Sequence, residues 1–159
     1  MKKIAFVALA FLAFSCNTKA QDTNNKEQKY GVEKTDAQWK AQLSAEAYTV
    51  LRQAGTERPF SSPLDKNYSP GVYTCKACGV PLYESEHKFD SGTGWPSFDR
   101  AVEENIEYDV DYKIGYARSE LKCSNCGSHL GHVFDDGPKN TTGKRHCING
   151  ITLEFIPQK

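Results

Sequence analysis

The segments Cys75-Lys-Ala-Cys78-Gly and Cys123-Ser-Asn-Cys126-Gly are two copies of one short pattern, and each is called a hook below. A hook can present two thiolates to one metal ion from a tight turn, and the glycine that follows allows the positive φ that such a turn often needs. Together the two hooks predict one tetrahedral zinc ion. Four sulfur ligands leave no open position on the metal, so we expect this zinc to be structural.

Two other uses of the hook cysteines stay open at this point. The chain carries an export signal, described below, and two disulfides would be stable in an oxidising compartment. A single Cys-x-x-Cys pair could also exchange thiols and disulfides, although two matched hooks favour a metal site.

The rest of the chain predicts a mostly β fold with short helices at its N-terminal end. Thr35 and Gln38 form a capping box at the start of one helix, Ser44 can cap a second, and Gly55 is a suitable stop. From Gly71 onward, short apolar or alternating runs predict strands, including a final strand pair. These runs are Val72–Thr74, Pro81–Tyr83, Ala101–Val102, Ile106–Ile114, Tyr116–Leu121 and Ile148–Ile156.

Length and charge limit the possible functions. The chain has 159 residues, which suits one domain, with 20 basic and 20 acidic residues and a net charge of zero. Because this balance provides no broad basic surface, we expect no nucleic-acid partner. We expect the protein to act as a monomer.

The N-terminus reads as a bacterial export signal followed by a tether. Lys2 and Lys3 precede the apolar run Ile4–Phe14, which is too short to span a bilayer comfortably. We favour a lipoprotein signal, residues 1–16, in which Cys16 is lipidated; ordinary cleavage after Ala20 is the alternative. Polar residues 17–34 predict a flexible tether before the domain, residues 35–159. We therefore expect an envelope protein, lipid-anchored and facing the periplasm.

Cys147 is the cysteine that neither the hooks nor the signal explains. It follows Arg145 and His146, and positive charge beside a thiol favours the reactive thiolate. The sequence therefore predicts a nucleophile at Cys147. The alternative is a buried cysteine with only a packing role.

Two further stretches carry polar or aromatic residues suited to a reaction site. His129 and His132 directly follow the second hook, and because the cysteines already satisfy zinc, they suit donation to a substrate oxygen. Asp136 could orient an imidazole or simply begin a turn before Gly-Pro. The glycine-rich run Ser91–Phe98 presents Trp95, whose exposed indole would suit an apolar or sulfur-bearing substrate group.

These stretches together resemble the methionine-R-sulfoxide reductase B family. The resemblance rests on Lys88–Phe98, His129–Phe134 and Arg145–Asn149, and it extends over nearly all of Lys34–Pro157. The two hooks match the zinc-containing branch. The resemblance implies a fold of two antiparallel sheets and thiol-dependent reduction of the R epimer of methionine sulfoxide in peptides and proteins.

The resemblance also implies how the reaction runs. Cys147 would attack the sulfoxide sulfur, His132 and His129 would protonate the departing oxygen, and Trp95 would contact the substrate methyl group. Asp136 and Arg145 would shape the site. Asn149 would help to hold the imidazoles or a bound water.

Two positions depart from the family pattern. Many members carry a resolving cysteine where this chain has Thr93, so we expect the sulfenic acid on Cys147 to be reduced by an external thiol or a thioredoxin-like partner. His146 replaces a common Tyr or Phe and adds a titrating group. A zinc-ribbon-like binding module and a thiol–disulfide exchange enzyme are the rival interpretations.

Overall fold

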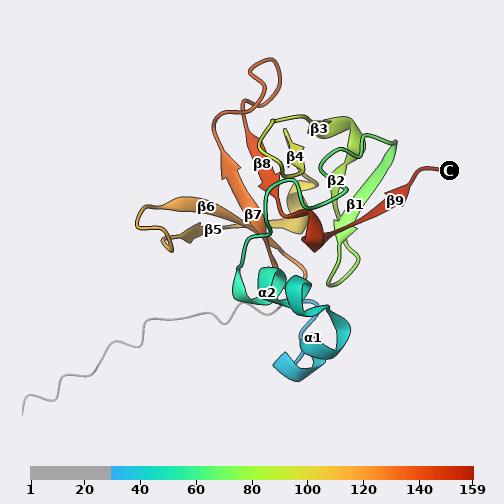
Figure 1. The fold of residues 1–159 in the computed structure, drawn as a ribbon, viewed down its shortest axis with the longest axis vertical. Coiled ribbons are helices and arrows are strands. Elements are labelled where there is room, and N and C mark those ends of the chain that lie inside the picture. The colour runs from blue at the N-terminus through green and yellow to red at the C-terminus, as the bar shows by residue number, and fades with distance from the viewer. Residues whose placement is uncertain (1–29) are drawn as a thin grey trace, which may run out of the picture.

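A computed structural model describes residues 30–159, which form a mostly β fold (Figure 1). The predicted signal, the lipidation candidate Cys16 and residues 17–29 of the predicted tether lie outside the described residues. None of the helices in the described range is long and apolar enough to cross a membrane. The helices are α1 (Asp36–Gln42), α2 (Ala45–Gln53) and three short 3-10 helices, η1 (Ser85–His87), η2 (Glu103–Asn105) and η3 (Gly150–Thr152). The strands are β1 (Gly71–Cys75), β2 (Pro81–Glu84), β3 (Lys88–Phe89), β4 (Ser97–Phe98), β5 (Ile106–Asp111), β6 (Arg118–Cys123), β7 (His129–Phe134), β8 (Arg145–Ile148) and β9 (Leu153–Pro157).

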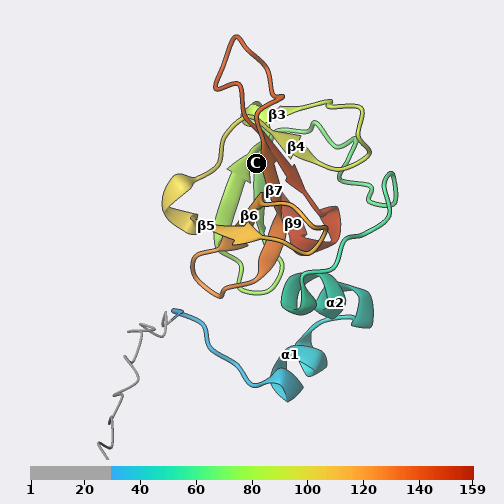
Figure 2. The same ribbon diagram turned by 90° about the vertical axis from the view of Figure 1, so that its left-hand side faces the viewer.

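The strands form two antiparallel sheets, as the resemblance implies. The smaller sheet has the order β2-β1-β9, and the larger has the order β3-β4-β8-β7-β6-β5. The β5–β6 hairpin extends away from the rest of the larger sheet (Figure 1). Both α-helices lie together beyond one end of the sheets (Figure 2), where α2 contacts β7 and η3.

Both helices begin at the caps that the sequence predicts. The Thr35 hydroxyl accepts the backbone N–H of Gln38, and the Gln38 side chain accepts the backbone N–H of Thr35, which completes the capping box. Ser44 caps α2 in the same manner through its hydroxyl. The second helix ends at Gln53, two residues before the predicted stop at Gly55, because Ala54 between them adopts the left-handed conformation.

Strand β8 lies inside the larger sheet, between β4 and β7. Its Cys147 is paired with Ser97 of β4 on one side and with His132 of β7 on the other. Because neighbouring residues of a strand point to opposite faces, Cys147 and His146 lie on different sides of the sheet. This register brings all three sequence motifs to one face.

An aromatic core lies on the His146 side. The ring of Phe98 stacks on Tyr83 at 4.3 Å and meets the edge of Tyr73 at 5.1 Å, measured between ring centroids. All three rings are fully buried, and each stabilises the fold by about 1.5–3 kcal/mol. His146 packs edge-on against Tyr83, and the Tyr83 hydroxyl lies 3.3 Å from Nδ1 of His146. His146 therefore belongs to the core and not to the face that carries Cys147.

The predicted final strand pair is wrong. The stretch Ile148–Ile156 supplies the end of β8 and most of β9, but these strands belong to different sheets. Between them η3 turns the chain, and the Glu57 carboxylate accepts the backbone N–H groups of Gly150 and Ile151 at the start of that turn. A long-range contact therefore decides where this segment bends.

Three other local predictions also differ from the structure. Ala101 and Val102 lie in no strand, and the alternating run that starts at Ile106 ends as a strand at Asp111. Strand β7 was not predicted, because its two histidines and its glycine mask the β pattern. The predicted wet face of β5 is also wrong, because Tyr108 and Val110 are exposed while Asp111 is buried.

The last residues of the predicted tether pack against the second hook. The Val32 N–H donates to the Asn125 carbonyl at 2.9 Å, and the Tyr30 hydroxyl donates to Glu107 at 3.1 Å. The Tyr30 ring occupies the space that a Cβ on Gly127 would need. Tyr30 and Val32 therefore make contacts with the domain, although both precede its predicted start at Thr35.

Candidate active site and metal centre

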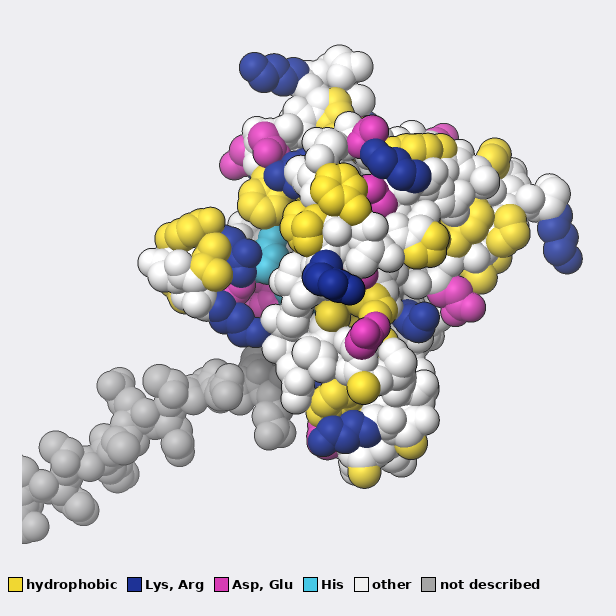
Figure 3. Space-filling model, in the orientation of Figure 1, with side chains coloured by type: hydrophobic (Ala, Val, Ile, Leu, Met, Phe, Trp, Pro, Cys, Tyr) yellow, Lys and Arg dark blue, Asp and Glu magenta, His cyan; other side chains and the backbone are white. Residues whose placement is uncertain are grey.

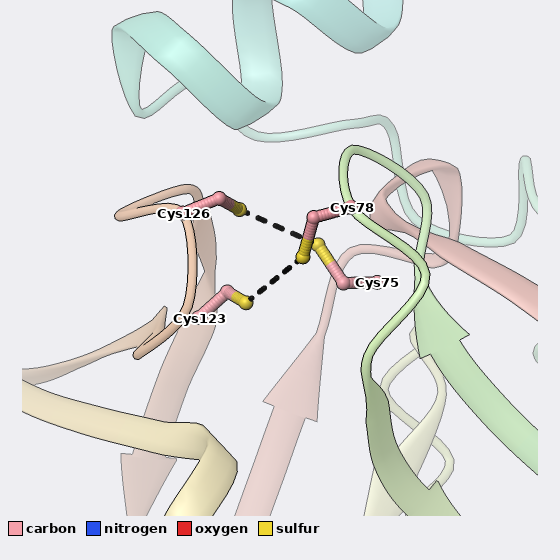
Figure 4. Close-up of side chains that lie close together, drawn as sticks. All are labelled: Cys75, Cys78, Cys123 and Cys126. Carbon is pink, nitrogen blue, oxygen red and sulfur yellow. Dashed lines mark hydrogen bonds between the residues drawn. The ribbon is translucent and has the colours of Figure 1, made fainter. Parts of the chain in front are cut away.

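The four hook cysteines converge on one point (Figure 4). Cys75 Sγ lies 3.8 Å from Cys126 Sγ, and Cys78 Sγ lies 3.6 Å from Cys123 Sγ. All four sulfurs lie within 4.8 Å of one another. A tetrahedral zinc with bonds of about 2.3 Å separates its sulfur ligands by about 3.8 Å, so the cluster fits this ion. The sulfurs are not bonded to one another, which favours a metal over the disulfide alternative.

The turn after each second cysteine explains the Gly of each hook. Gly79 and Gly127 have φ values of 78° and 67°, which L side chains rarely adopt. Their N–H groups donate to the carbonyls of Cys75 and Cys123, the last residues of β1 and β6. Because β1 and β6 belong to different sheets, an ion held here would join the two sheets.

Cys147 is half-buried and its surroundings oppose ionisation. Burial raises the pKa of the Cys147 thiol, and this effect outweighs the Arg145 charge and a hydrogen bond from the Thr93 hydroxyl, which both favour the thiolate. The expectation that neighbouring charge makes Cys147 a thiolate is therefore wrong for the free protein. At neutral pH the sulfur is predominantly a thiol.

Arg145 contributes less charge to the site than the sequence suggests. Its guanidinium binds both carboxylate oxygens of Asp136, at 2.8 and 2.9 Å, and stacks over the Phe134 ring at 4.5 Å. Asp136 therefore orients Arg145 and not an imidazole. The bidentate pair fixes the guanidinium beside Cys147 and partly neutralises it.

The two predicted histidines lie together and are held by carboxylates that the sequence analysis overlooked. The ring centroids of His129 and His132 are 5.4 Å apart. Glu120 binds His129 Nδ1 at 2.5 Å, and Asp111 binds His132 Nε2 at 2.9 Å. Burial lowers the pKa of His132, while the Asp111 hydrogen bond opposes that shift. Asp111 and Glu120 lie on β5 and β6, where their charges read as part of a solvated face.

The Asp111 carboxylate is itself firmly held. Arg118 donates to it at 2.5 Å, and the Lys113 N–H donates at 2.7 Å. The Lys113 N–H, together with the His132 and Arg118 side chains, lowers the pKa of Asp111 despite its desolvation. The β5–β6 hairpin thus supplies a charged acceptor that fixes the orientation of the His132 ring.

Asn149 contacts backbone on both sides of the site. Its Oδ1 accepts the Glu57 N–H at 3.0 Å, and its Nδ2 donates to the Leu130 carbonyl at 3.0 Å. Within the described residues its amide is therefore engaged by main chain, whereas the resemblance implied contact with an imidazole or water. Asn149 fixes the segment of β7 between the two histidines.

Glu57 is another residue that the sequence did not reveal. Its backbone carbonyl accepts the indole N–H of Trp95 at 3.2 Å, while its carboxylate accepts the N–H groups at the start of η3. Trp95 is half-buried, where an exposed indole was expected. Burial raises the pKa of Glu57, and its two backbone hydrogen bonds partly offset this.

Gly131 allows the close approach of β7 to β8. A Cβ at this position would run into the Cys147 carbonyl. The glycine between the two histidines is therefore required by packing against the nucleophile's own backbone.

In the space-filling view a histidine lies in a hollow between the β5–β6 hairpin and the body of the molecule (Figure 3). Charged side chains border the hollow on the hairpin side, and hydrophobic ones gather on the other.

A cysteine beside a fixed guanidinium and two carboxylate-bound imidazoles is typical of enzymes that use a thiol as nucleophile. The SelR domain family matches residues 43–157. A peptide methionine sulfoxide reductase MsrB of Chromohalobacter salexigens is 50% identical over 127 residues, which cover 79% of this chain and 96% of that protein. Reductases of the same name from Leifsonia xyli and Methanosarcina barkeri are 50% and 54% identical, over 81% and 78% of this chain and 94% and 87% of theirs.

The chain therefore belongs to the methionine-R-sulfoxide reductase B family. It is an oxidoreductase that reduces methionine-R-sulfoxide to methionine by the cysteine chemistry general to this family.

The raised pKa of Cys147 predicts how alkylation depends on pH. We expect the rate of reaction with iodoacetamide to keep rising above about pH 8.5, the ordinary thiol pKa, because only the thiolate reacts. Replacing Arg145→Gln removes a charge that favours the thiolate, so the rate at pH 8 should fall about tenfold, one pKa unit. Lys139→Gln, a distant surface change, is the control. A rate that levels off below pH 7 would contradict the buried-thiol description.

The Asp111–His132 contact predicts a shift in the pH dependence of turnover. Asp111→Asn removes an acceptor that raises the pKa of His132, so the protonated imidazole becomes scarcer at neutral pH. We expect kcat to fall about tenfold or more and the alkaline limb of its pH profile, where the donor loses its proton, to move to lower pH. Asp109→Asn on the same strand is the matched control, because Asp109 binds Lys122 instead. An unchanged profile at an unchanged Tm would show that Asp111 does not act through His132.

Proposed function

We propose that Cys147 is the nucleophile and that the carboxylate-held histidines supply the proton. The Cys147 sulfur attacks the sulfoxide sulfur, and His132 or His129 protonates the sulfoxide oxygen so that it can leave. The substrate sulfur gains two electrons and departs as methionine. The released oxygen then bonds to the Cys147 sulfur as the bond between the two sulfurs breaks and its electron pair goes to the substrate sulfur. Cys147 is left as a sulfenic acid.

The strand register is the observation that supports this assignment. It pairs Cys147 with His132 on one side and with Ser97 of the Trp95-bearing segment on the other. A sulfoxide held between an apolar wall and directional donors has only one orientation that satisfies both, which accounts for selection of one epimer. We propose that Trp95 contacts the substrate methyl group and that Arg145, fixed by Asp136, stabilises the sulfur as it ionises.

We propose that an external thiol or a thioredoxin-like partner reduces the sulfenic acid. Within residues 30–159, four of the five cysteines lie in the metal centre and the fifth is Cys147. Thr93, which stands where many family members carry the resolving cysteine, cannot form a disulfide. A first thiol therefore condenses with the sulfenic acid, which releases water and leaves a mixed disulfide on Cys147. A second thiol then attacks this mixed disulfide, so that Cys147 is restored as a thiol and the two external thiols leave as a disulfide.

A single turnover without reductant tests this cycle. We expect one equivalent of methionine per chain and, after addition of dimedone, one dimedone adduct on the Cys147 peptide, read by mass spectrometry. Cys147→Ser should form no methionine. An intramolecular disulfide that includes Cys147 would contradict the proposed route of reduction, while methionine formation by Cys147→Ser would contradict the nucleophile itself.

We propose that the four hook cysteines hold one structural zinc. Metal analysis of the purified protein should give about one zinc per chain, and Cys78→Ser should lose it and lower the Tm by about 10 °C or more. Cys147→Ser is the matched control and should keep both zinc and Tm. Less than about half an equivalent of zinc in the parent protein would contradict this site.

We also propose that the protein is exported as a monomer and anchored by a lipid on Cys16, on the periplasmic face of the membrane. The apolar run before Cys16 in the sequence supports this proposal. Cys16→Ser should move the protein from the membrane fraction to the soluble fraction. Membrane association that survives this substitution would contradict a lipid anchor at Cys16.

A further inference from the structure

Phe60 is held in a backbone conformation that its side chain disfavours. Its φ is 62°, and within residues 30–159 the only other non-glycine residue with positive φ is Ala54, which ends α2. For a bulky residue such a φ is unusual and strained. The Phe60 side chain is also 66% exposed. Burial therefore does not explain why an aromatic residue, and not glycine or asparagine, stands here.

The neighbours of Phe60 belong to the substrate wall. The Phe60 N–H donates to the Gly94 carbonyl at 2.7 Å, and its ring lies where a Cβ on Gly94 would come within 2.8 Å of Cδ2. Gly94 stands between Thr93 and Trp95, in the segment whose Ser97 is paired with Cys147 in the sheet. The loop that carries Phe60 is tied to this segment a second time, because Glu57 accepts the Trp95 indole N–H.

The exposed ring therefore stands beside the loop that carries Trp95, at a fixed position. Two backbone-anchored contacts hold the loop of Phe60 against the loop of Trp95, so the ring has little freedom to move away. Hydrophobic side chains also lie on the side of the hollow opposite the β5–β6 hairpin (Figure 3). A strained, exposed and anchored aromatic residue at the edge of a reaction site is a candidate for contact with substrate.

We propose that Phe60 determines specificity for polypeptide substrates, by packing against the chain next to the oxidised methionine. This inference rests on the reductase activity described above. Free methionine sulfoxide carries an ammonium and a carboxylate in place of flanking peptide groups, and these charges lose hydration against an apolar ring without gaining a partner. A polypeptide presents neutral amides and side chains, which pack on the ring. Phe60 thus favours sulfoxides within peptides over the free amino acid.

The test compares two substrates and two strain-relieving variants. Phe60→Gly relieves the positive φ and removes the ring, whereas Ala54→Gly relieves the same kind of strain away from the site. We expect Phe60→Gly to raise KM about tenfold for a pentapeptide with methionine-R-sulfoxide at its centre. Its kcat for both substrates should stay within about twofold of the parent, and its KM for free methionine-R-sulfoxide should stay equal or fall, because the apolar ring that desolvates the free amino acid's charges is gone. Its Tm should equal or exceed that of the parent. Phe60→Tyr should keep the parent's KM, and Ala54→Gly should change neither KM.

The outcomes separate this role from a structural one. An equal loss on both substrates, or a lower Tm for Phe60→Gly, would mean that Phe60 supports the fold, and would overturn the proposal. An unchanged KM for the pentapeptide would overturn it as well. A parent protein inactive on both substrates would overturn the reductase activity and this proposal together.

Discussion

The antiparallel pairing of β8 with β4 and β7 is the constraint on which the site depends. It sets Cys147 opposite Ser97 and His132, so motifs far apart in the sequence meet on one face. A shift of one residue would send Cys147 into the aromatic core and His146 to the site. Gly131 permits the pairing because any side chain there would strike the Cys147 carbonyl. The hooks bring the ends of β1 and β6 together, and with them the two sheets.

Burial and charge act against each other at Cys147, and burial prevails. Arg145 would favour the thiolate, but Asp136 shares its charge through two hydrogen bonds, and the sulfur is largely withdrawn from water. Burial therefore raises the pKa of the Cys147 thiol in the free protein, although Arg145 lies beside it. Burial and charge also oppose each other at Asp111, which holds His132, but there the charge prevails. The Asp111 carboxylate stays ionised because it accepts hydrogen bonds from Arg118, the Lys113 N–H and His132.

Local spacing made part of this structure predictable. The hooks, the capping box at Thr35 and the short motifs around Trp95, His132 and Cys147 each depend on residues close in sequence, and the sheets and the convergence of the hook cysteines agree with them. The contacts of Glu57, Asp111 and Glu120 join distant segments, and their charges resembled ordinary surface residues. The same reason explains the wrong final strand pair, since the bend at Gly150 depends on the Glu57 carboxylate.

The central claim is that a fixed thiol, an apolar wall and carboxylate-held donors surround one chiral sulfur. Turnover with separated R and S epimers of a methionine-sulfoxide peptide, under identical thiol concentration, tests it most directly. The account predicts rapid conversion of the R epimer and essentially none of the S epimer, since only one hand directs oxygen to the imidazoles while its methyl group meets Trp95. Equal rates on both epimers would contradict it.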